Sequence, residues 1–248
     1  MNWWSYTRKP SVHERRQKAA READLAIIFG TDHSGGLGKV TLTRQNYATP
    51  YGVLPTERGI VDQLAVALGE EAAFDEELHH RNEHSIELAI VWLHHARDGR
   101  AIKVVPILCG SFAHFVAGQA DPATDDAIEK VTTVLREAMR GRKALVVAAA
   151  DLAHVGPAFD GRPVTAEGQA KLRLADNAIL QEMATGGADG FFRQLKAMED
   201  SNNVCGLPPI YLSLRLLGAT KGEMVAYDIC PADEDDTSWV SVAGMLWR

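Results

Sequence analysis

The chain has 248 residues, of which 46% are hydrophobic and 24% are charged, and its formal net charge is −7. This composition predicts a folded protein with a sizeable core and excludes global disorder. The negative charge excludes nucleic acid as the main partner, because binding phosphates requires a basic face.

Cysteine usage and hydropathy indicate the cellular setting. Cys109, Cys205 and Cys230 are too widely spaced for a disulfide framework or a metal knuckle, which predicts a reducing, cytoplasmic environment. No apolar stretch reaches the roughly 18 residues of a membrane span, and no signal peptide is visible. The sequence leaves the oligomeric state open.

Residues 1–22 differ from the rest of the chain. They carry six basic and two acidic residues, a local charge of +4 that leaves −11 on the remainder. We expect a basic arm or helix here, with Trp3 and Trp4 ahead of a helix that begins at Ser11 or Val12. Ser11 and Glu14 fit a capping box. Residues 23–248 show no linker or internal repeat and are predicted to form one domain.

Apolar runs separated by turn signals predict an α/β domain. Strands are expected at Leu25–Phe29, Lys39–Leu42, Ile102–Leu108, Leu145–Val147, Glu223–Ile229 and Trp239–Leu246. Helices are expected at Gly59–Leu68, from Asn82 through Leu93, from Thr124 or Asp125 to Met139, from Thr165 to about Met183, over about Ala188–Met198, and after Pro208 and Pro209. The run at Leu145 is typical of a buried parallel strand. Pro106 favours an edge position or an irregularity in its strand.

The strand at Leu145–Val147 is followed by three alanines and then by Asp151 and His154. In open α/β sheets, ligands bind beyond the carboxyl ends of the strands. The alanines leave room there, so Asp151 and His154 are candidates for a ligand site. The alternative is that Asp151 caps a turn and His154 hydrogen-bonds to it, without a ligand.

Two further candidate groups lie far away in the sequence. His33 follows the first strand in a glycine-rich turn that also holds Asp32. Cys205 precedes a helix, whose dipole lowers the pKa of a thiol and favours the thiolate that binds metals. Imidazole, carboxylate and thiolate groups together are typical of a transition-metal or redox site.

The segment before Leu88 is rich in polar residues. Asn82 can cap the following helix, which places Glu83 and His84 in its first turn. The adjacent pairs His79–His80 and His94–His95 point in different directions on a helix, so we expect all four to be solvated. Cys109, at the end of its strand, is expected to be a buried small hydrophobe.

Taken together, these motifs resemble the Memo family, also described as AmmeMemoRadiSam system protein B. The stretches that carry the resemblance are Ile28–His33, Tyr47–Gly52, Asn82–Glu87, Val104–Leu108, Val146–Gly156 and Cys205–Ile210. The resemblance runs from about Asp24 to the C-terminus. It implies the fold of the LigB-like class III extradiol dioxygenases, a single three-layer αβα domain around a central mixed, mostly parallel sheet.

The resemblance also implies a reduced-copper or iron site with redox chemistry. His33 matches a metal ligand, Cys205 matches a thiolate ligand, and His154 matches the histidine that serves as acid or base in the dioxygenases, with Asp151 beside it. We therefore predict His33, Cys205 and His154 as metal ligands and His154 and Asp151 as the catalytic pair. Asp32, Glu83 and His84 are predicted to line the site.

One part of the family pattern is missing. The family has another histidine ligand in an early Pro-His-x-x-Tyr-like motif, which residues 1–23 do not contain, and His13 does not match it. We expect the site to lack that ligand and its strand. Two alternatives follow: a non-heme iron oxidoreductase of the extradiol type, with Glu83 or Glu87 as the carboxylate ligand, and a non-enzymatic module that binds a peptide or small anion. In each case the partner is an unknown small molecule or protein.

Overall fold

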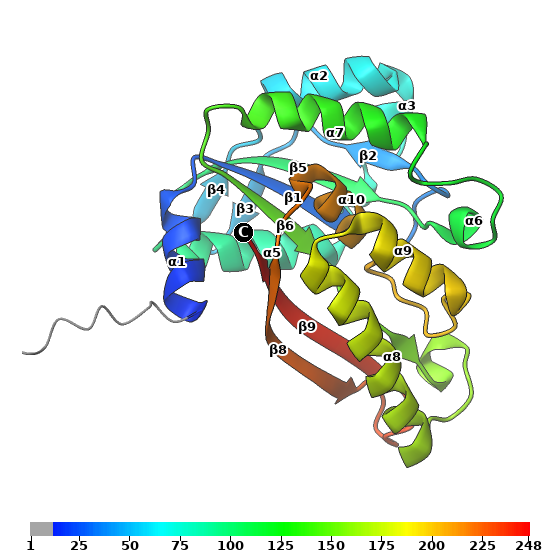
Figure 1. The fold of residues 1–248 in the computed structure, drawn as a ribbon. Coiled ribbons are helices and arrows are strands. Elements are labelled where there is room, and N and C mark those ends of the chain that lie inside the picture. The colour runs from blue at the N-terminus through cyan, green and yellow to red at the C-terminus, as the bar shows by residue number, and fades with distance from the viewer. Residues whose placement is uncertain (1–11) are drawn as a thin grey trace, which may run out of the picture.

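The computed structural model describes residues 12–248 (Figure 1). The strands are β1 (Leu25–Thr31), β2 (Val40–Leu42), β3 (Tyr47–Thr49), β4 (Gly52–Leu54), β5 (Lys103–Cys109), β6 (Ala144–Ala149), β7 (His154–Val155), β8 (Gly222–Pro231) and β9 (Trp239–Trp247). The helices are α1 (Val12–Glu22), α2 (Arg58–Leu68), α3 (Glu70–Phe74), α4 (His79–Asn82), α5 (His84–Ala96), α6 (Ala113–Val116), α7 (Asp126–Met139), α8 (Ala166–Thr185), α9 (Ala188–Ala197) and α10 (Leu207–Leu217), with a short 3-10 helix at Pro157–Phe159.

The main sheet has the strand order β2-β5-β1-β6. β5 and β6 run parallel to β1, whereas β2 runs antiparallel to β5. All seven residues of β1 are buried, as expected for the centre of a parallel sheet. The predicted α/β class with a mixed, mostly parallel sheet is confirmed.

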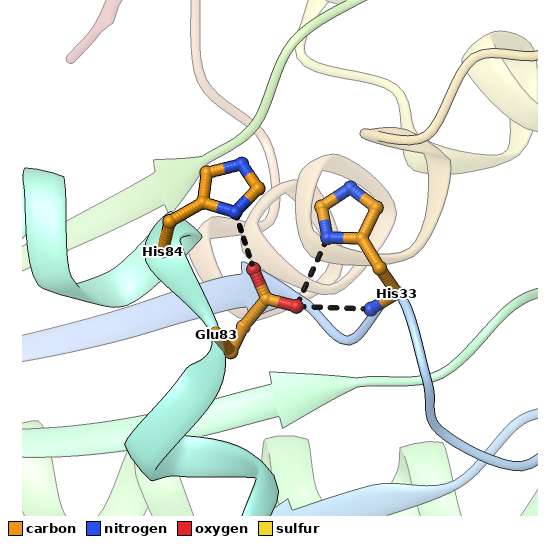
Figure 2. A group of neighbouring side chains, drawn as sticks. All are labelled: His33, Glu83 and His84. Atoms are coloured by element: carbon orange, nitrogen blue, oxygen red, sulfur yellow. Dashed lines mark hydrogen bonds and ion pairs between the residues drawn. The ribbon is translucent and has the colours of Figure 1, made fainter. Parts of the chain in front are cut away.

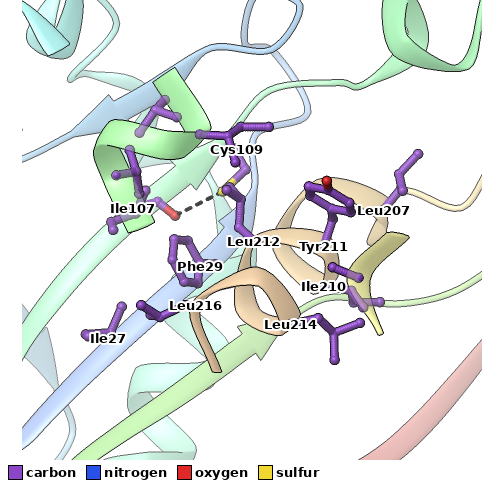
Figure 3. Packing of buried hydrophobic residues seen from close by; sticks show 14 of the residues in the cluster. Ile27, Phe29, Ile107, Cys109, Leu207, Ile210, Tyr211, Leu212, Leu214 and Leu216 are labelled. Atoms are coloured by element: carbon purple, nitrogen blue, oxygen red, sulfur yellow. Dashed lines mark hydrogen bonds between the residues drawn. The ribbon is translucent and has the colours of Figure 1, made fainter. Parts of the chain in front are cut away.

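Side chains alternate across β1 and define the two helical layers. Leu25, Ile27 and Phe29 belong to a core cluster that also contains residues of α2, α7 and α10, part of which is drawn in Figure 3. Ala26 and Ile28 belong to a second cluster with residues of α5 and of the end of α1. Figure 1 shows α2 and α7 on one face of the sheet and α5 on the other. These are the three layers of an αβα domain.

Two details of the sheet differ from the sequence-based expectation. β6 is half-buried along its whole length, because it pairs only with β1 among the described strands and so forms an edge. Pro106 lies inside the sheet, in β5 between β1 and β2. Its nitrogen faces the same flank as the N–H groups of Val104 and Gly110, which donate to Pro55 and Lys39. β2 ends at Leu42, opposite Ile107, so no described strand lies beside Pro106 on that flank and its missing N–H leaves no ladder hydrogen bond unmade. Pro106 is therefore at an irregularity of the sheet, one of the two predicted positions, and not in an edge strand.

The chain closes with a long hairpin. β8 and β9 pair antiparallel and, together with β7, form a separate three-stranded sheet. α8 packs on this hairpin, where the Tyr227 hydroxyl donates to Asp176 at 2.7 Å (Figure 1). Both closing strands are confirmed. β7 begins at His154, one of the site residues predicted from the sequence, and pairs with Trp239 and Val240 of β9.

The expected N-terminal helix is present as α1, and it is held against the domain. The guanidinium of Arg97, at the end of α5, donates to the carbonyls of Ala20 and Ala23, and the Arg15 guanidinium contacts Glu223 of β8 at 2.6 Å. The predicted capping box at Ser11 and the aromatic residues Trp3 and Trp4 lie outside the described residues. None of the described helices is long and apolar enough to cross a membrane.

Candidate metal centre

Three segments meet at the carboxyl end of β1. The Ser85 hydroxyl donates to the carbonyl of Thr31 at 2.9 Å, and the Thr31 hydroxyl donates to the carbonyl of Cys205 at 3.0 Å. Gly30 allows this approach, because a Cβ added there would lie 2.5 Å from Cγ1 of Ile86 and 2.6 Å from the Ser85 hydroxyl. The first turn of α5 and the loop before α10 are thereby fixed around the residues that follow β1.

Glu83 organises the histidines of this region. It is the N-cap of α5, and its carboxylate accepts the backbone N–H of Ser85 at 3.0 Å. The same carboxylate accepts the backbone N–H of His33 at 3.1 Å and lies 2.9 Å from Nδ1 of its ring. Nδ1 of His84 is 3.4 Å from the other carboxylate oxygen. Asn82 ends α4 and does not cap α5, contrary to the sequence-based expectation.

The two imidazoles lie side by side above this carboxylate. Their ring centroids are 5.1 Å apart and their planes differ by 11°. Figure 2 shows both Nδ1 atoms facing Glu83 and the other ring nitrogens of His33 and His84 pointing away from it on the same side. The ring side chains are 42% and 66% exposed, whereas the Glu83 side chain is 7% exposed. The Nε2 atoms are therefore accessible to a ligand.

The electrostatics favour an ionised Glu83. Burial alone would raise the pKa of Glu83, but the backbone N–H groups of His33 and Ser85 and the His33 ring together lower it below its ordinary value. A carboxylate that accepts the Nδ1–H of an imidazole fixes the tautomer and leaves the Nε2 lone pair free for a metal. This arrangement is common behind metal-binding histidines.

The Asp151–His154 segment lies at the end of the neighbouring strand, β6. Nδ1 of His154 donates to the carbonyl of Leu152 at 3.1 Å, and the ring meets Phe159 edge-on. Burial lowers the pKa of His154, and the nearby His33 ring lowers it further. Asp151 is exposed. Burial thus favours the neutral imidazole at His154.

Cys205 sits in the loop between α9 and α10. Three non-glycine residues of this loop, Glu199, Asp200 and Asn203, have positive φ angles of 54°, 46° and 50°. Burial raises the pKa of Cys205 to about 11, and Asp151 adds to the effect. The expectation that the helix dipole lowers this pKa was wrong, because desolvation outweighs the dipole.

The alanines at the end of β6 do not leave an open space for a ligand. A Cβ added to Gly206 would lie 2.2 Å from the carbonyl oxygen of Asp151 and 2.8 Å from Cβ of Ala150. The small side chains therefore let the start of α10 pack directly on the end of β6. The open part of the region is at His33 and His84.

Asp32 belongs to a neighbouring group. Its carboxylate is buried, accepts the N–H of Ser34, and lies 3.0 Å from Nδ1 of His79. Hydrogen bonding to Asp32 raises the pKa of His79. Lys39 pairs with Glu76 of the same group at 3.3 Å. Asp32 thus anchors the turn that carries His33.

All four histidines expected to be solvated make side-chain hydrogen bonds, and His95 does so with the Tyr51 hydroxyl, which lies 2.9 Å from its Nδ1. His79 pairs with Asp32, as described above. His80 contacts the Tyr47 hydroxyl at 2.7 Å and the carbonyl of Thr41 at 3.0 Å, and burial lowers its pKa to about 4. His94 is 1% exposed, whereas His95 is exposed as expected. Cys109 is buried, as predicted, and burial raises the pKa of its thiol.

Two groups of potential ligand atoms are compact enough to hold a metal ion within the described part of the chain. They are His33, Glu83 and His84, and Asp32, Glu76 and His79, with the atoms of each group within 4.8 Å of one another. Neither group contains Cys205 or His154. Ser85 and Thr31, which join the segments, were missed from the sequence. The Glu-His-Ser order at the start of a helix is a signal that indicates Ser85.

A family model described as "Memo-like protein" matches residues 10–246 of this chain. The chain belongs to the Memo-like family. It is 28% identical over 209 residues to a "MEMO1 family protein" of Methanosarcina acetivorans, and the aligned region covers 83% of this chain and 68% of that relative. The identity to a "MEMO1 family protein" of Archaeoglobus fulgidus is 24% over 229 residues, or 92% of this chain and 77% of the relative.

Stability of the Cys205 loop in this Memo-like protein should depend on pH through Asp200. Burial raises the pKa of this half-buried carboxyl from 3.8 to about 6, although it accepts the N–H of Val204 at 2.9 Å. Folding therefore favours the protonated carboxyl of Asp200. Its contribution to the free energy of unfolding is complete below about pH 4, the pKa of the unfolded state, and is lost as the pH rises through about 6, the pKa of the folded state.

The variant Asp200→Asn keeps the acceptor, tolerates the positive φ and does not ionise. In urea unfolding at pH 7, we expect the variant to exceed the wild type in free energy of unfolding by on the order of 2 kcal/mol. The difference should vanish at pH 4. An equal difference at both pH values would show that ionisation of Asp200 is not its cause.

Proposed function

We propose that this Memo-like protein binds a redox-active transition metal, iron(II) or copper, through Nε2 of His33 and His84. The observation that carries the proposal is the shared contact of both Nδ1 atoms with one buried capping carboxylate, Glu83. Metal-binding histidines usually present their second ring nitrogen to such a carboxylate. Both rings are exposed enough to turn toward a shared ion.

The chemistry of the ligand atoms narrows the choice of metal. Imidazole ligands suit iron, copper, zinc and nickel, whereas magnesium and calcium prefer oxygen ligands. When bound, iron or copper supplies one-electron redox chemistry. We propose that His154, whose imidazole burial favours in the neutral form, holds or transfers a proton in the reaction.

Glu83 is proposed as the residue that orients the two histidines and not as a metal ligand. Its two oxygens already interact with the N–H groups of Ser85 and His33 and with both imidazoles. This assignment counts against the extradiol dioxygenase alternative, which needs a carboxylate ligand on the iron. Cys205 enters the proposal only as an outer group, because it belongs to neither of the two compact groups of ligand atoms.

The test is a metal titration of the purified protein under anaerobic conditions. Iron(II), copper(I) and zinc(II) are added separately to metal-free wild type, His84→Ala and Cys205→Ala, and bound metal is measured by mass spectrometry. We expect one iron or copper per chain, at least tenfold weaker binding in His84→Ala, and a smaller change in Cys205→Ala. His95→Ala is the matched control, because His95 lies on the same helix but outside both groups of ligand atoms.

A stronger loss in Cys205→Ala than in His84→Ala would overturn the assignment and favour the thiolate site. If none of the three ions binds stoichiometrically, the proposal that the protein binds a metal is overturned. In that case the binding of a peptide or small anion becomes the leading function.

A further inference from the structure

Two strand edges have no partner among the described strands. β6 pairs with β1 on one side only, and beyond Ser241 the strand β9 pairs only with β8. The chain that continues β6 is joined to β9, because the N–H of Leu152 donates to the carbonyl of Ser241 at 2.9 Å and the N–H of Ser241 donates to the carbonyl of Ala153 at 3.0 Å. Figure 1 draws the hairpin on the side of β6 away from β1. From this junction β9 therefore runs back along β6 without pairing with it.

The edge of β6 lacks the usual protections of an exposed strand. Edge strands of soluble proteins carry charged residues, proline or bulges that prevent further pairing. β6 has the sequence Ala-Leu-Val-Val-Ala-Ala, and each of its residues is half-buried. Val146 and Ala148 pack against the core cluster of α2, α7 and α10, whereas Leu145 and Val147 pack against the cluster of α5. A strand added at this edge would extend both cores, so it needs apolar side chains on both faces.

Residues 1–11 of this chain, which lie outside the described residues, have the composition that such a strand requires. Trp3 and Trp4 are adjacent, and neighbouring side chains of a strand point to opposite faces. In a strand, one of the two rings therefore covers each core cluster. Tyr6 also favours a strand. Pro10 ends the run, because proline has no N–H to donate to a ladder.

The ion pairs and hydrogen bonds of α1 place the end of this segment near both edges. Arg15, near the start of α1, contacts Glu223 at the open end of the β8–β9 hairpin at 2.6 Å. Just after α1, the N–H of Asp24 donates to the carbonyl of Lys143, immediately before β6, at 3.0 Å. Eleven extended residues span up to about 36 Å, whereas the six residues of β6 span about 20 Å. Residues 1–11 are therefore long enough to run along all of β6.

We propose that residues 1–11 add a strand to the edge of β6, between β6 and β9, with Trp3 and Trp4 on its opposite faces. The added strand joins the four-stranded and three-stranded sheets and covers the apolar edge. α1 and the hairpin flank this edge, which favours a single strand over the sheet of a second copy as its occupant. The proposal does not rest on metal binding.

Amide hydrogen exchange of the whole chain, resolved by ¹⁵N NMR without added metal, tests this proposal. The double variant Trp3→Ser, Trp4→Ser removes both rings, whereas Ser5→Pro keeps the rings and removes one N–H from the added strand. In both variants we expect at least tenfold faster exchange of the β6 amides that face away from β1, with wild-type rates in β1. Trp92→Ser is the matched control, because Trp92 is 68% exposed on α5, and it should leave all these rates unchanged.

Fast exchange of the outward β6 amides in the wild type would overturn the proposal, as would wild-type rates in Ser5→Pro. Equal acceleration in β1 and β6 would also overturn it, because that result indicates general destabilisation. Light scattering of the wild type identifies the source of the strand. We expect a monomer with a protected β6, whereas protection that is lost when a dimer dissociates on dilution would assign the edge to a second copy and overturn the proposal.

Discussion

Replacing Glu83 by alanine is expected to weaken metal binding by up to a hundredfold, the range seen when a group that orients metal-binding histidines is removed. The variant loses the carboxylate that contacts Nδ1 of both His33 and His84. It also leaves the backbone N–H groups of His33 and Ser85 without their acceptor. Titration with iron(II) and copper(I) measures the first effect.

The same substitution should lower the free energy of unfolding by about 2 kcal/mol, because it removes the cap of a 13-residue helix. Glu83→Gln separates the two roles. A glutamine retains an oxygen for one of the two backbone N–H groups but carries no charge, so we expect most of the stability to return and the metal affinity to remain low. Wild-type metal affinity in Glu83→Ala would contradict the role given to this carboxylate.

The second large effect is expected for Gly206→Ala. The added Cβ would lie 2.2 Å from the carbonyl oxygen of Asp151, a backbone atom that cannot turn aside. The φ angle of Gly206 is −75°, which alanine adopts freely, so the cost is purely steric. We expect the free energy of unfolding to fall by about 3 kcal/mol, at the upper end of the usual cost of overpacking.

Gly59→Ala is the control for this substitution. Gly59 lies in the first turn of α2, and an added Cβ would meet only the end of the Glu57 side chain at 3.9 Å. Alanine favours the helix over glycine, so this variant should be as stable as the wild type or more stable by about 0.5 kcal/mol. Urea unfolding of both variants measures the contrast. Similar stabilities would show that α10 does not pack against the end of β6 as described.

The sequence predicts the framework of this fold well, because β-branched and apolar runs specify the strands locally. The position of the functional region at the carboxyl ends of β1 and β6 also follows from sequence, since parallel strands place their ends on one edge of a sheet. His33 could be singled out in this way, and Glu83 and His84 by their place in the first turn of the next helix. Their direct contact could not, because it depends on where α5 begins relative to β1.

The errors have a common physical origin in tertiary contacts. Asparagine is preferred over glutamate at helix N-caps. Glu83 nevertheless caps α5, where its carboxylate also contacts Nδ1 of His33. The helix dipole suggests a reactive Cys205, but burial reverses the sign of the pKa shift. His80 appears solvated by spacing alone, and only the fold supplies Tyr47 and Thr41 as its partners.

The most direct test of the proposed metal centre is anomalous X-ray diffraction from crystals grown anaerobically with iron(II). The proposal predicts one anomalous peak within bonding distance of Nε2 of both His33 and His84, with Glu83 still in contact with their Nδ1 atoms. A peak bonded to Cys205 and His154 in place of His84 would contradict it, as would crystals that take up no iron at this position.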